Sequence, residues 1–421
     1  MNYYDPMLFM STPQCPFIMG LTAALYEPVD GDLLREVVES LRERFPYFYV
    51  KAKVDGKDLI PVPNPLPITV RNTWDPIDLD SREANYHLAA FKYEGNRLAL
   101  EITHAISDGP GFLPYFKSVL FCYLSRKTGQ EFDPAGFRLP GDVIPERETG
   151  DPCAGLDIDS AEEPFYQKKP TTDFYQLNPE RKGEWRIFYL KLPEDQVMRY
   201  CRENDGSPNV LVSVLLSKAI RRIDPDSQKT ITSNVAIDHK AILGNFENYH
   251  MFVNIAEVDF PKSRENDDIM KSCTIARGQV MIQVQPENSL YAAKVKKQRF
   301  EQINQIPSLQ MKIDLMKKVV TQPRGTMSVS YINSRTFGPL DPYIKEVFAL
   351  AEPSTTDVLC EIFCINHSFF VSFVQNFTSE DLLKAFMQEL QNADISGEII
   401  RKEALRFCGV RYDDLEGLSF S

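Results

Sequence analysis

The sequence predicts an α/β protein made of two similar halves, each a mixed β-sheet with helices, and three observations favour that fold class. A strand hairpin followed by an amphipathic helix is expected at 87–126, and the same order of elements recurs from residue 358 onward. Between them, residues 127–184 hold seven prolines and many charges, which is typical of a long linker. We therefore expect an N-terminal half at 1–126, a crossover linker at 127–184 and a C-terminal half at 185–421.

In the N-terminal half, hydrophobic spacing alternates between the strand period and the helix period. Val37, Val38 and Leu41 have helical spacing, and Pro46 ends that helix. We expect, in chain order, a strand within 13–26, a helix at 33–45, a strand at 47–54, an irregular Pro-rich stretch at 59–70, strands at 87–93 and 97–103, and a helix at 111–126.

The C-terminal half restarts with a strand-like run after the linker. Ser207 is a good N-cap for one of its helices, and Thr378 for another. We expect strands at 185–192, 231–237, 327–332, 358–365 and 369–375, and helices at 193–203, 207–223, 264–283, 288–319 and from 378 onward.

Composition and charge exclude several classes of protein. The chain has 421 residues, is 43% hydrophobic and carries a formal net charge of −12, so nucleic-acid binding and a basic membrane-binding patch are not expected. It contains no apolar run of transmembrane length and no secretory signal pattern at its start. We expect a cytoplasmic protein.

The eight cysteines form no CxxC motif, and with only five histidines a metal site is not expected. Cys360 and Cys364 lie four residues apart in an apolar, strand-like run. Side chains at that spacing lie on the same face of a strand, so we expect two reduced core thiols.

The strongest functional signal is the six-residue motif His104-Ala105-Ile106-Ser107-Asp108-Gly109, which lies between a predicted strand and a predicted helix. Because side chains alternate along a strand, His104 continues the apolar face of Leu100 and Ile102, toward an interior or a cleft between the halves. An imidazole there can act as a general base. Asp108 can support the ring or the loop, and Gly109 permits a sharp exit from the motif.

A purely structural interpretation of the motif stays open. His104 can be a hydrogen-bonded core histidine, and Asp108 can be the N-cap of the helix that contains Pro110 in its first turn. His239 and His250 flank a loop, where we expect ordinary packing roles.

The His-x-x-x-Asp-Gly pattern after a strand, in a chain of two similar halves, resembles the chloramphenicol acetyltransferase-like superfamily. That superfamily includes nonribosomal peptide synthetase condensation domains, alcohol acetyltransferases and plant-type acyltransferases. Weaker similarities are Arg44-Phe45-Pro46 at the end of the first helix, the segment from Ile237 to His250, and the strand 328–332. Two positions depart from the family pattern: Thr103 stands where many condensation domains have an additional histidine, and Lys240 stands where an arginine is usual. The plant-type D-F-G-W-G motif is absent.

The resemblance implies direct acyl transfer in a channel between the halves. The donor would be a thioester of coenzyme A or of an acyl carrier protein's phosphopantetheine, and the acceptor a small alcohol or amine. His104 would be the general base, with Asp108 as structural support and Gly109 beside it. No covalent acyl-enzyme, bound cofactor or metal is implied, and a monomer would suffice. Ser330, Tyr331 and Asn254 are candidate donors to the oxyanion.

Two other functions remain open. The departures at Thr103 and Lys240 favour a non-catalytic binding or scaffold protein on the same fold. A carrier-protein-dependent condensation enzyme is the third candidate, and it would differ from the first in requiring a carrier-bound donor.

Overall fold

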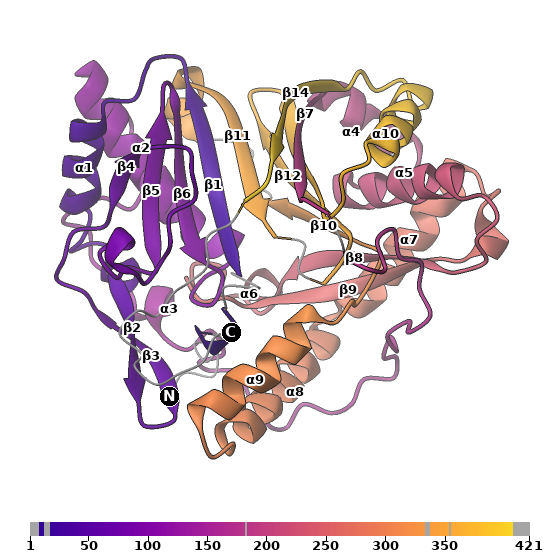
Figure 1. Cartoon of the computed structure of the whole chain (residues 1–421), viewed down its shortest axis with the longest axis horizontal. Helices are drawn as coiled ribbons and strands as arrows, with labels where there is room; N and C mark the ends of the chain where they lie inside the picture. Colours follow the sequence, from indigo (N-terminus) through magenta and orange to yellow (C-terminus); the bar gives the residue numbers. More distant parts are fainter. Residues whose placement is uncertain (1–7, 12–16, 182, 333–336, 353–354, 407–421) are drawn as a thin grey trace.

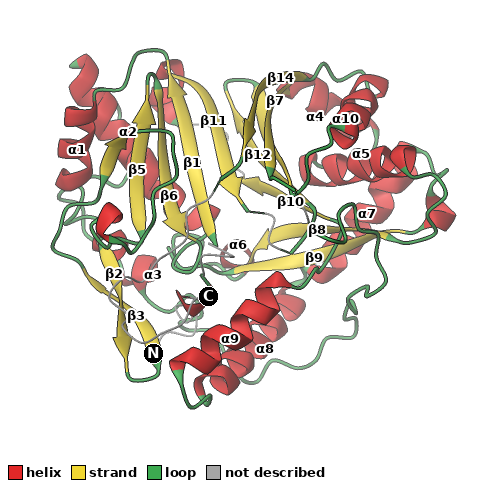
Figure 2. Cartoon of the chain, viewed as in Figure 1, coloured by secondary structure: helices red, strands yellow, loops and turns green. Residues whose placement is uncertain are grey.

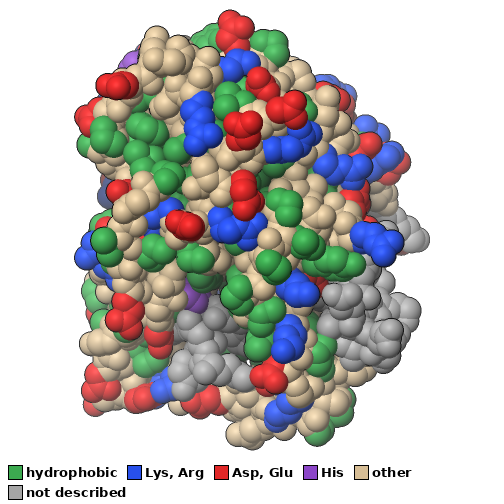
Figure 3. All heavy atoms as spheres, turned by 90° about the vertical axis from the view of Figure 1, so that its left-hand side faces the viewer, with side chains coloured by type: hydrophobic (Ala, Val, Ile, Leu, Met, Phe, Trp, Pro, Cys, Tyr) green, Lys and Arg blue, Asp and Glu red, His purple; other side chains and the backbone are tan. Residues whose placement is uncertain are grey.

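Two β-sheets lie side by side, and helices cover their outer faces (Figures 1 and 2). The computed structural model describes residues 8–11, 17–181, 183–332, 337–352 and 355–406. Within these ranges, no helix is both long enough and apolar enough to cross a membrane. On the face drawn in Figure 3, acidic and basic side chains are interspersed, so no field of one sign covers that face.

The N-terminal lobe is built on a five-stranded sheet, which the helices α1 and α2 cover. Asp30 caps α1 by accepting hydrogen bonds from the backbone N–H groups of Asp32 and Leu33. In sheet order the strands are β11 (Ile344–Ala351), β1 (Ile18–Leu25), β6 (Arg97–Thr103), β5 (Ala89–Glu94) and β4 (Val70–Asn72), and the helices are α1 (Gly31–Ser40) and α2 (Gly109–Thr128).

The C-terminal lobe is built on a seven-stranded sheet. Its strands, in sheet order, are β14 (Glu398–Ala404), β7 (Arg186–Pro193), β13 (Ser368–Gln375), β12 (Val358–Ile365), β10 (Met327–Ile332), β8 (Ile231–Asp238) and β9 (Val253–Phe260). Its helices are α4 (Glu194–Glu203), α5 (Pro208–Ile223), α7 (Ile269–Gln283), α8 (Pro286–Asn304), α9 (Leu309–Thr321) and α10 (Asp381–Asn392). The strands β8 and β9 reach toward the N-terminal lobe (Figure 1).

The remaining elements are short. They are the hairpin β2 (Val50–Asp55) and β3 (Asp58–Pro63), the helices α3 (Glu146–Thr149) and α6 (His239–Ile242), and the 3-10 turns η1 (Leu8–Met10), η2 (Pro46–Phe48), η3 (Arg82–Ala84), η4 (Lys262–Arg264) and η5 (Gly338–Tyr343).

The two lobes repeat one topology, as the sequence predicts. The order β11-β1-β6-β5-β4 corresponds to β14-β7-β13-β12-β10. In each lobe the last pair of this series is parallel and the others are antiparallel. The hairpin and helix around the motif, β5-β6-α2, therefore have β12-β13-α10 as their counterpart.

The two sheets do not follow the predicted boundaries of the two halves, because β11 comes from the C-terminal part of the chain and pairs with β1 (Figure 1). The segments 1–126 and 185–421 thus describe the lobes only in part. β4, β9, β11 and β14 were not anticipated from the sequence. The predicted helix at 288–319 is two helices, α8 and α9, because Pro307 interrupts the helical pattern. The Pro-rich stretch expected to be irregular contains β3, whose prolines are tolerated in an isolated two-stranded hairpin. Residues 13–16 of the first predicted strand lie outside the described residues.

Each face of the C-terminal sheet has its own core. Cys360, Ile362 and Cys364 of β12 pack with α5 and α10 on the outer face, as predicted for the two cysteines. Leu359 and Phe363, on the alternate positions, join the core that the sheet shares with the N-terminal lobe. The inner face of β12 is therefore part of the contact between the lobes, and it positions the site described next.

Candidate active site

His104 follows β6 directly and lies at the contact between the lobes. Its backbone N–H donates to the carbonyl of Phe17 at 2.7 Å, and its Nδ1 lies 2.8 Å from the carbonyl oxygen of Ser107. A carbonyl can only accept, so Nδ1 carries the proton and the neutral ring has its lone pair on Nε2. No described residue hydrogen-bonds to that Nε2. Burial lowers the pKa of His104 below its ordinary value of 6.5, which favours the neutral form.

The ring of Phe17 stacks on the imidazole, with ring centroids 5.0 Å apart and planes 18° from parallel. Phe17 has a φ of +53°, in the left-handed region that non-glycine residues rarely adopt. This backbone conformation brings the ring against His104. Contact with an aromatic face removes water from one side of the imidazole, in keeping with its lowered pKa.

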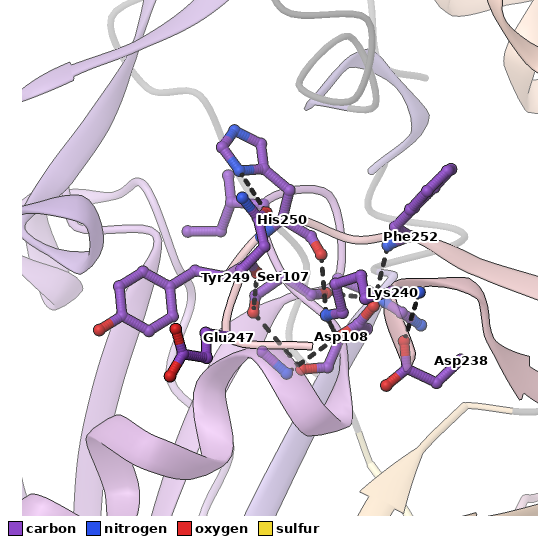
Figure 4. A network of polar contacts seen from close by, with 12 residues as sticks. Ser107, Asp108, Asp238, Lys240, Glu247, Tyr249, His250 and Phe252 are labelled. Atoms are coloured by element: carbon purple, nitrogen blue, oxygen red, sulfur yellow. Dashed lines mark hydrogen bonds and ion pairs between the residues drawn. The ribbon is translucent and has the colours of Figure 1, made fainter. Parts of the chain in front are cut away.

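Asp108 braces the structure and makes no hydrogen bond to His104. One oxygen, Oδ1, accepts from the backbone N–H of Gly111 at 2.9 Å, which caps α2. That oxygen also forms an ion pair with Lys240, and Oδ2 accepts from the backbone N–H of Phe252 at 2.8 Å (Figure 4). Both charged side chains are 0% exposed. Asp108 is therefore the N-cap of α2, and its ion pair and its second hydrogen bond join it to Lys240 and Phe252 of the other lobe.

A segment of the C-terminal lobe, Tyr249–Phe252, lies against the motif (Figure 4). The hydroxyl of Ser107 donates to the carbonyl of Tyr249 at 2.6 Å, and Lys240 Nζ donates to the carbonyl of His250 at 3.1 Å. The Tyr249 hydroxyl donates to Glu148 of the linker at 2.7 Å. His250 therefore acts here through its backbone, and the lobes are joined by a buried polar network at the motif itself.

Two glycines permit this close approach. A Cβ on Gly111 would lie 2.4 Å from the carbonyl oxygen of Tyr249, which is backbone and cannot move away easily. A Cβ on Gly109 would lie 2.8 Å from Cδ1 of Ile332, at the end of β10. The sequence singled out Gly109 for a sharp turn, but both residues are needed because the other lobe packs against them.

A cavity of about 320 Å³ lies between the lobes, and His104 is on its wall. The lining comes from both sides: β1 and the motif in one lobe, and β8, β9, β10 and β12 in the other. Its polar and ionisable lining residues are His104, Asp108, Asn234, Asp238, Arg324, Ser328, Ser330, Tyr331, Glu352, Thr355 and Glu361.

The three residues predicted from the sequence as oxyanion donors are placed differently. Ser330 lines the cavity, and Asn254 does not. Tyr331 also borders it, but its ring packs 5.9 Å from that of Phe369 on the opposite face of β10 from Ser330. Ser330 is the one whose side chain shares a face with the cavity.

Three ionisable groups near the site were missed from the sequence. Burial raises the pKa of Glu361 to about 7 and that of Asp238 to about 6. Burial lowers the pKa of Lys296 to about 8, and its ammonium lies 5.4 Å from the ring centroid of Phe252. Of these, only Glu361 had a readable signal: it is a single charged residue inside the apolar run of β12.

The corresponding place in the C-terminal lobe has a different role. Asn376 follows β13 as His104 follows β6, and its carbonyl accepts from the amide of Asn178 in the linker at 2.8 Å. The neighbouring Asp357 accepts from the backbone N–H of Leu177 at 2.7 Å. That strand end binds the linker, so the histidine-containing motif is present in one lobe alone among the described residues.

Comparison with solved structures identifies the fold. Polyketide synthase associated protein 5 from Mycobacterium tuberculosis has a TM-score of 0.61 and 15% identity, over 92% of this chain and 96% of that one. TRI101 of F. sporotrichioides, complexed with coenzyme A and T-2, has a TM-score of 0.59 and 10% identity, over 94% and 99%. The starter condensation domain of rhizomide synthetase RzmA, in complex with C8-CoA, has a TM-score of 0.57 and 10% identity, over 92% and 91%.

These similarities extend over more than nine-tenths of the chain. The protein therefore shares the two-lobed, chloramphenicol acetyltransferase-like fold of these structures. No protein-family model and no curated protein matches the sequence.

Proposed function

We propose that the protein is an acyltransferase that moves an acyl group from a thioester to the hydroxyl or amino group of a small acceptor. The observation that carries this proposal is His104 on the wall of the cavity between the lobes, with Nδ1 held by the Ser107 carbonyl and Nε2 left as a base. Two proteins of the same fold are described with coenzyme A or an acyl-coenzyme A bound, which supports a thioester donor.

In the proposed step, the acceptor's oxygen or nitrogen attacks the thioester carbonyl while Nε2 of His104 takes its proton. The tetrahedral intermediate then collapses, the carbon–sulfur bond breaks, and the imidazolium returns the proton to the departing thiolate. The products are an ester or amide and a free thiol. Because the proton moves from acceptor to sulfur, neither a covalent acyl-enzyme nor an additional reagent is required.

Asp108 contributes by position rather than by proton transfer. Its two oxygens are occupied by the α2 N-terminus, Lys240 and the backbone of Phe252. It holds the loop that supplies the Ser107 carbonyl, and through that carbonyl it keeps His104 in the required tautomer. The oxyanion donor is proposed to be Ser330, whose hydroxyl would turn from Glu361 toward the oxyanion.

The test is release of free thiol, followed with a thiol-reactive dye, from short- to long-chain acyl-coenzyme A with a panel of alcohols and amines. We expect release that depends on both donor and acceptor, with the acylated acceptor detected by mass spectrometry. Release only from donors on a carrier protein would instead favour the condensation enzyme. Absence of acceptor-dependent release from either donor would contradict the proposal and favour the scaffold.

A further inference from the structure

Glu361 is a carboxyl group in an apolar setting, on the wall of the same cavity as His104. It lies in the middle of β12, is 6% exposed, and its neighbours on the same face of the strand are Leu359 and Phe363. A carboxyl group rarely occupies such a place without a partner or a ligand, because burial without hydrogen bonds is costly.

The sheet satisfies this carboxyl only in part. Ser330 is the register neighbour of Glu361 on β10, and its hydroxyl is hydrogen-bonded to the carboxyl. The other oxygen, Oε2, has no hydrogen-bond partner among the described residues. Ser372, the register neighbour on β13, has a buried hydroxyl that likewise has no partner within the described ranges. The strands therefore leave one carboxyl oxygen for a group that they do not themselves supply.

The charges around the cavity show what kind of group fits. Lys240 pairs with Asp108 and also lies near Asp238, and Lys296 lies near Asp108, whereas no lysine or arginine among the described residues acts on the carboxyl group of Glu361. Among the described residues that line the cavity, Arg324 is the one lysine or arginine, and it is exposed. A cationic ligand would supply the countercharge that Glu361 lacks among the described residues. The raised pKa of Glu361 is what burial without such a cation produces.

We propose that Glu361 binds an ammonium group of the acceptor, so that the acceptor is an amino alcohol or a diamine. One group of the acceptor, an alcohol or a neutral amine, would be acylated at His104, and a second, protonated amine would be held at Glu361. This inference rests on the proposed acyl transfer, because only that reaction makes the ligand an acceptor. The binding of an ammonium group at Glu361 is measurable without turnover. The ion pair would favour a cationic acceptor, because a neutral ligand would leave the buried carboxylate without a countercharge.

Two probes of equal chain length test the inference: aminohexanol and hexanediol. Their dissociation constants are measured at pH 8 by titration calorimetry or ligand-observed NMR, with no thioester present. For the unaltered protein we expect aminohexanol to bind about 10- to 100-fold more tightly than hexanediol, as for a charge-assisted hydrogen bond. Equal binding of the two would overturn the inference.

Glu361→Gln distinguishes a cation from a neutral donor, because it keeps the shape and an accepting oxygen but removes the charge. We expect the preference for aminohexanol to disappear in E361Q and to persist, reduced, in Glu361→Asp, which serves as a second variant if E361Q does not fold. The matched control is Glu346→Gln, a buried carboxyl outside the cavity that pairs with Arg401 at 2.7 Å, and it should keep the preference. An undiminished preference in E361Q would overturn the inference.

The same titration in His104→Ala separates this inference from the proposed function. We expect the ammonium preference to survive in H104A. If acceptor-dependent thiol release is absent in the unaltered protein while the ammonium preference is present, the proposed acyl transfer fails and the binding site stands. If thiol release is present without the preference, the acyl transfer stands and the role of Glu361 fails.

Discussion

The ion pair between Asp108 and Lys240 should be among the most sensitive points of the molecule. Both side chains are 0% exposed, and they come from different lobes. Replacing Lys240 by Met leaves the carboxylate with two backbone donors, from Gly111 and Phe252, but without the ammonium group that pairs with it. Removing one partner of a buried pair costs about 3–5 kcal/mol. That is a large part of a total stability on the order of 5–15 kcal/mol.

Urea denaturation measures this loss, followed by fluorescence of Trp74 and Trp185, one on each side of the linker. The double variant Asp108→Asn with Lys240→Met removes both charges of the pair, so we expect it to regain about 2 kcal/mol relative to K240M. The control is Arg35→Met, which breaks an exposed pair with Asp32 and should change the free energy of unfolding by less than about 1 kcal/mol. A K240M variant within about 1 kcal/mol of the unaltered protein would refute the account of the brace.

Three further predictions follow from the same geometry. Gly111→Ala should lose about 3 kcal/mol of stability, because the new Cβ meets the backbone carbonyl of Tyr249. Gly109→Ala should lose about 1 kcal/mol, because its Cβ meets a methyl group of Ile332 that can move. Equal losses in thermal denaturation would contradict this. The acid limb of kcat/KM against pH should have its midpoint below 6.5, because burial lowers the pKa of His104 and only the neutral ring is a base; a midpoint above 7 would argue against it. Glu361→Gln should match the unaltered protein in free energy of unfolding below pH 4.5 and exceed it by up to about 3 kcal/mol at pH 8. The reason is that the raised pKa of Glu361, about 7, makes its ionisation destabilise the folded protein as the pH rises. A difference that does not change with pH, measured by urea denaturation, would count against this.

Much of the fold could be predicted from the sequence, because the pattern of neighbouring residues indicates each strand, turn and helix. Alternation along 97–103 and the short turn before it predicted β6 and its hairpin, and the same reasoning located β12 and β13. The repeat of hairpin and helix then indicated two similar lobes, which the equivalent strand orders confirm. Alternation also oriented His104 toward the contact between the lobes, although its role as the base stays a prediction.

The parts that could not be predicted depend on contacts between distant residues. β11 belongs to the first sheet although it comes from the end of the chain, and a single sequence contains no sign of that exchange. The partner of Asp108 is 132 residues away, and the carbonyl that receives the Ser107 hydroxyl is 142 residues away. Glu361 was a charged residue in an apolar strand, a signal that could have drawn attention to the cavity wall.

The central claim, that His104 is the base of an acyl transfer, is tested most directly by acceptor-dependent thiol release in His104→Ala. Loss of a general base typically costs 10²- to 10⁴-fold in rate, and we expect a loss in that range with the fold intact by circular dichroism. His367→Ala is the matched control, since its side chain is 99% exposed in the turn between β12 and β13 and should leave the rate unchanged. Turnover by H104A at the rate of the unaltered protein would contradict the account.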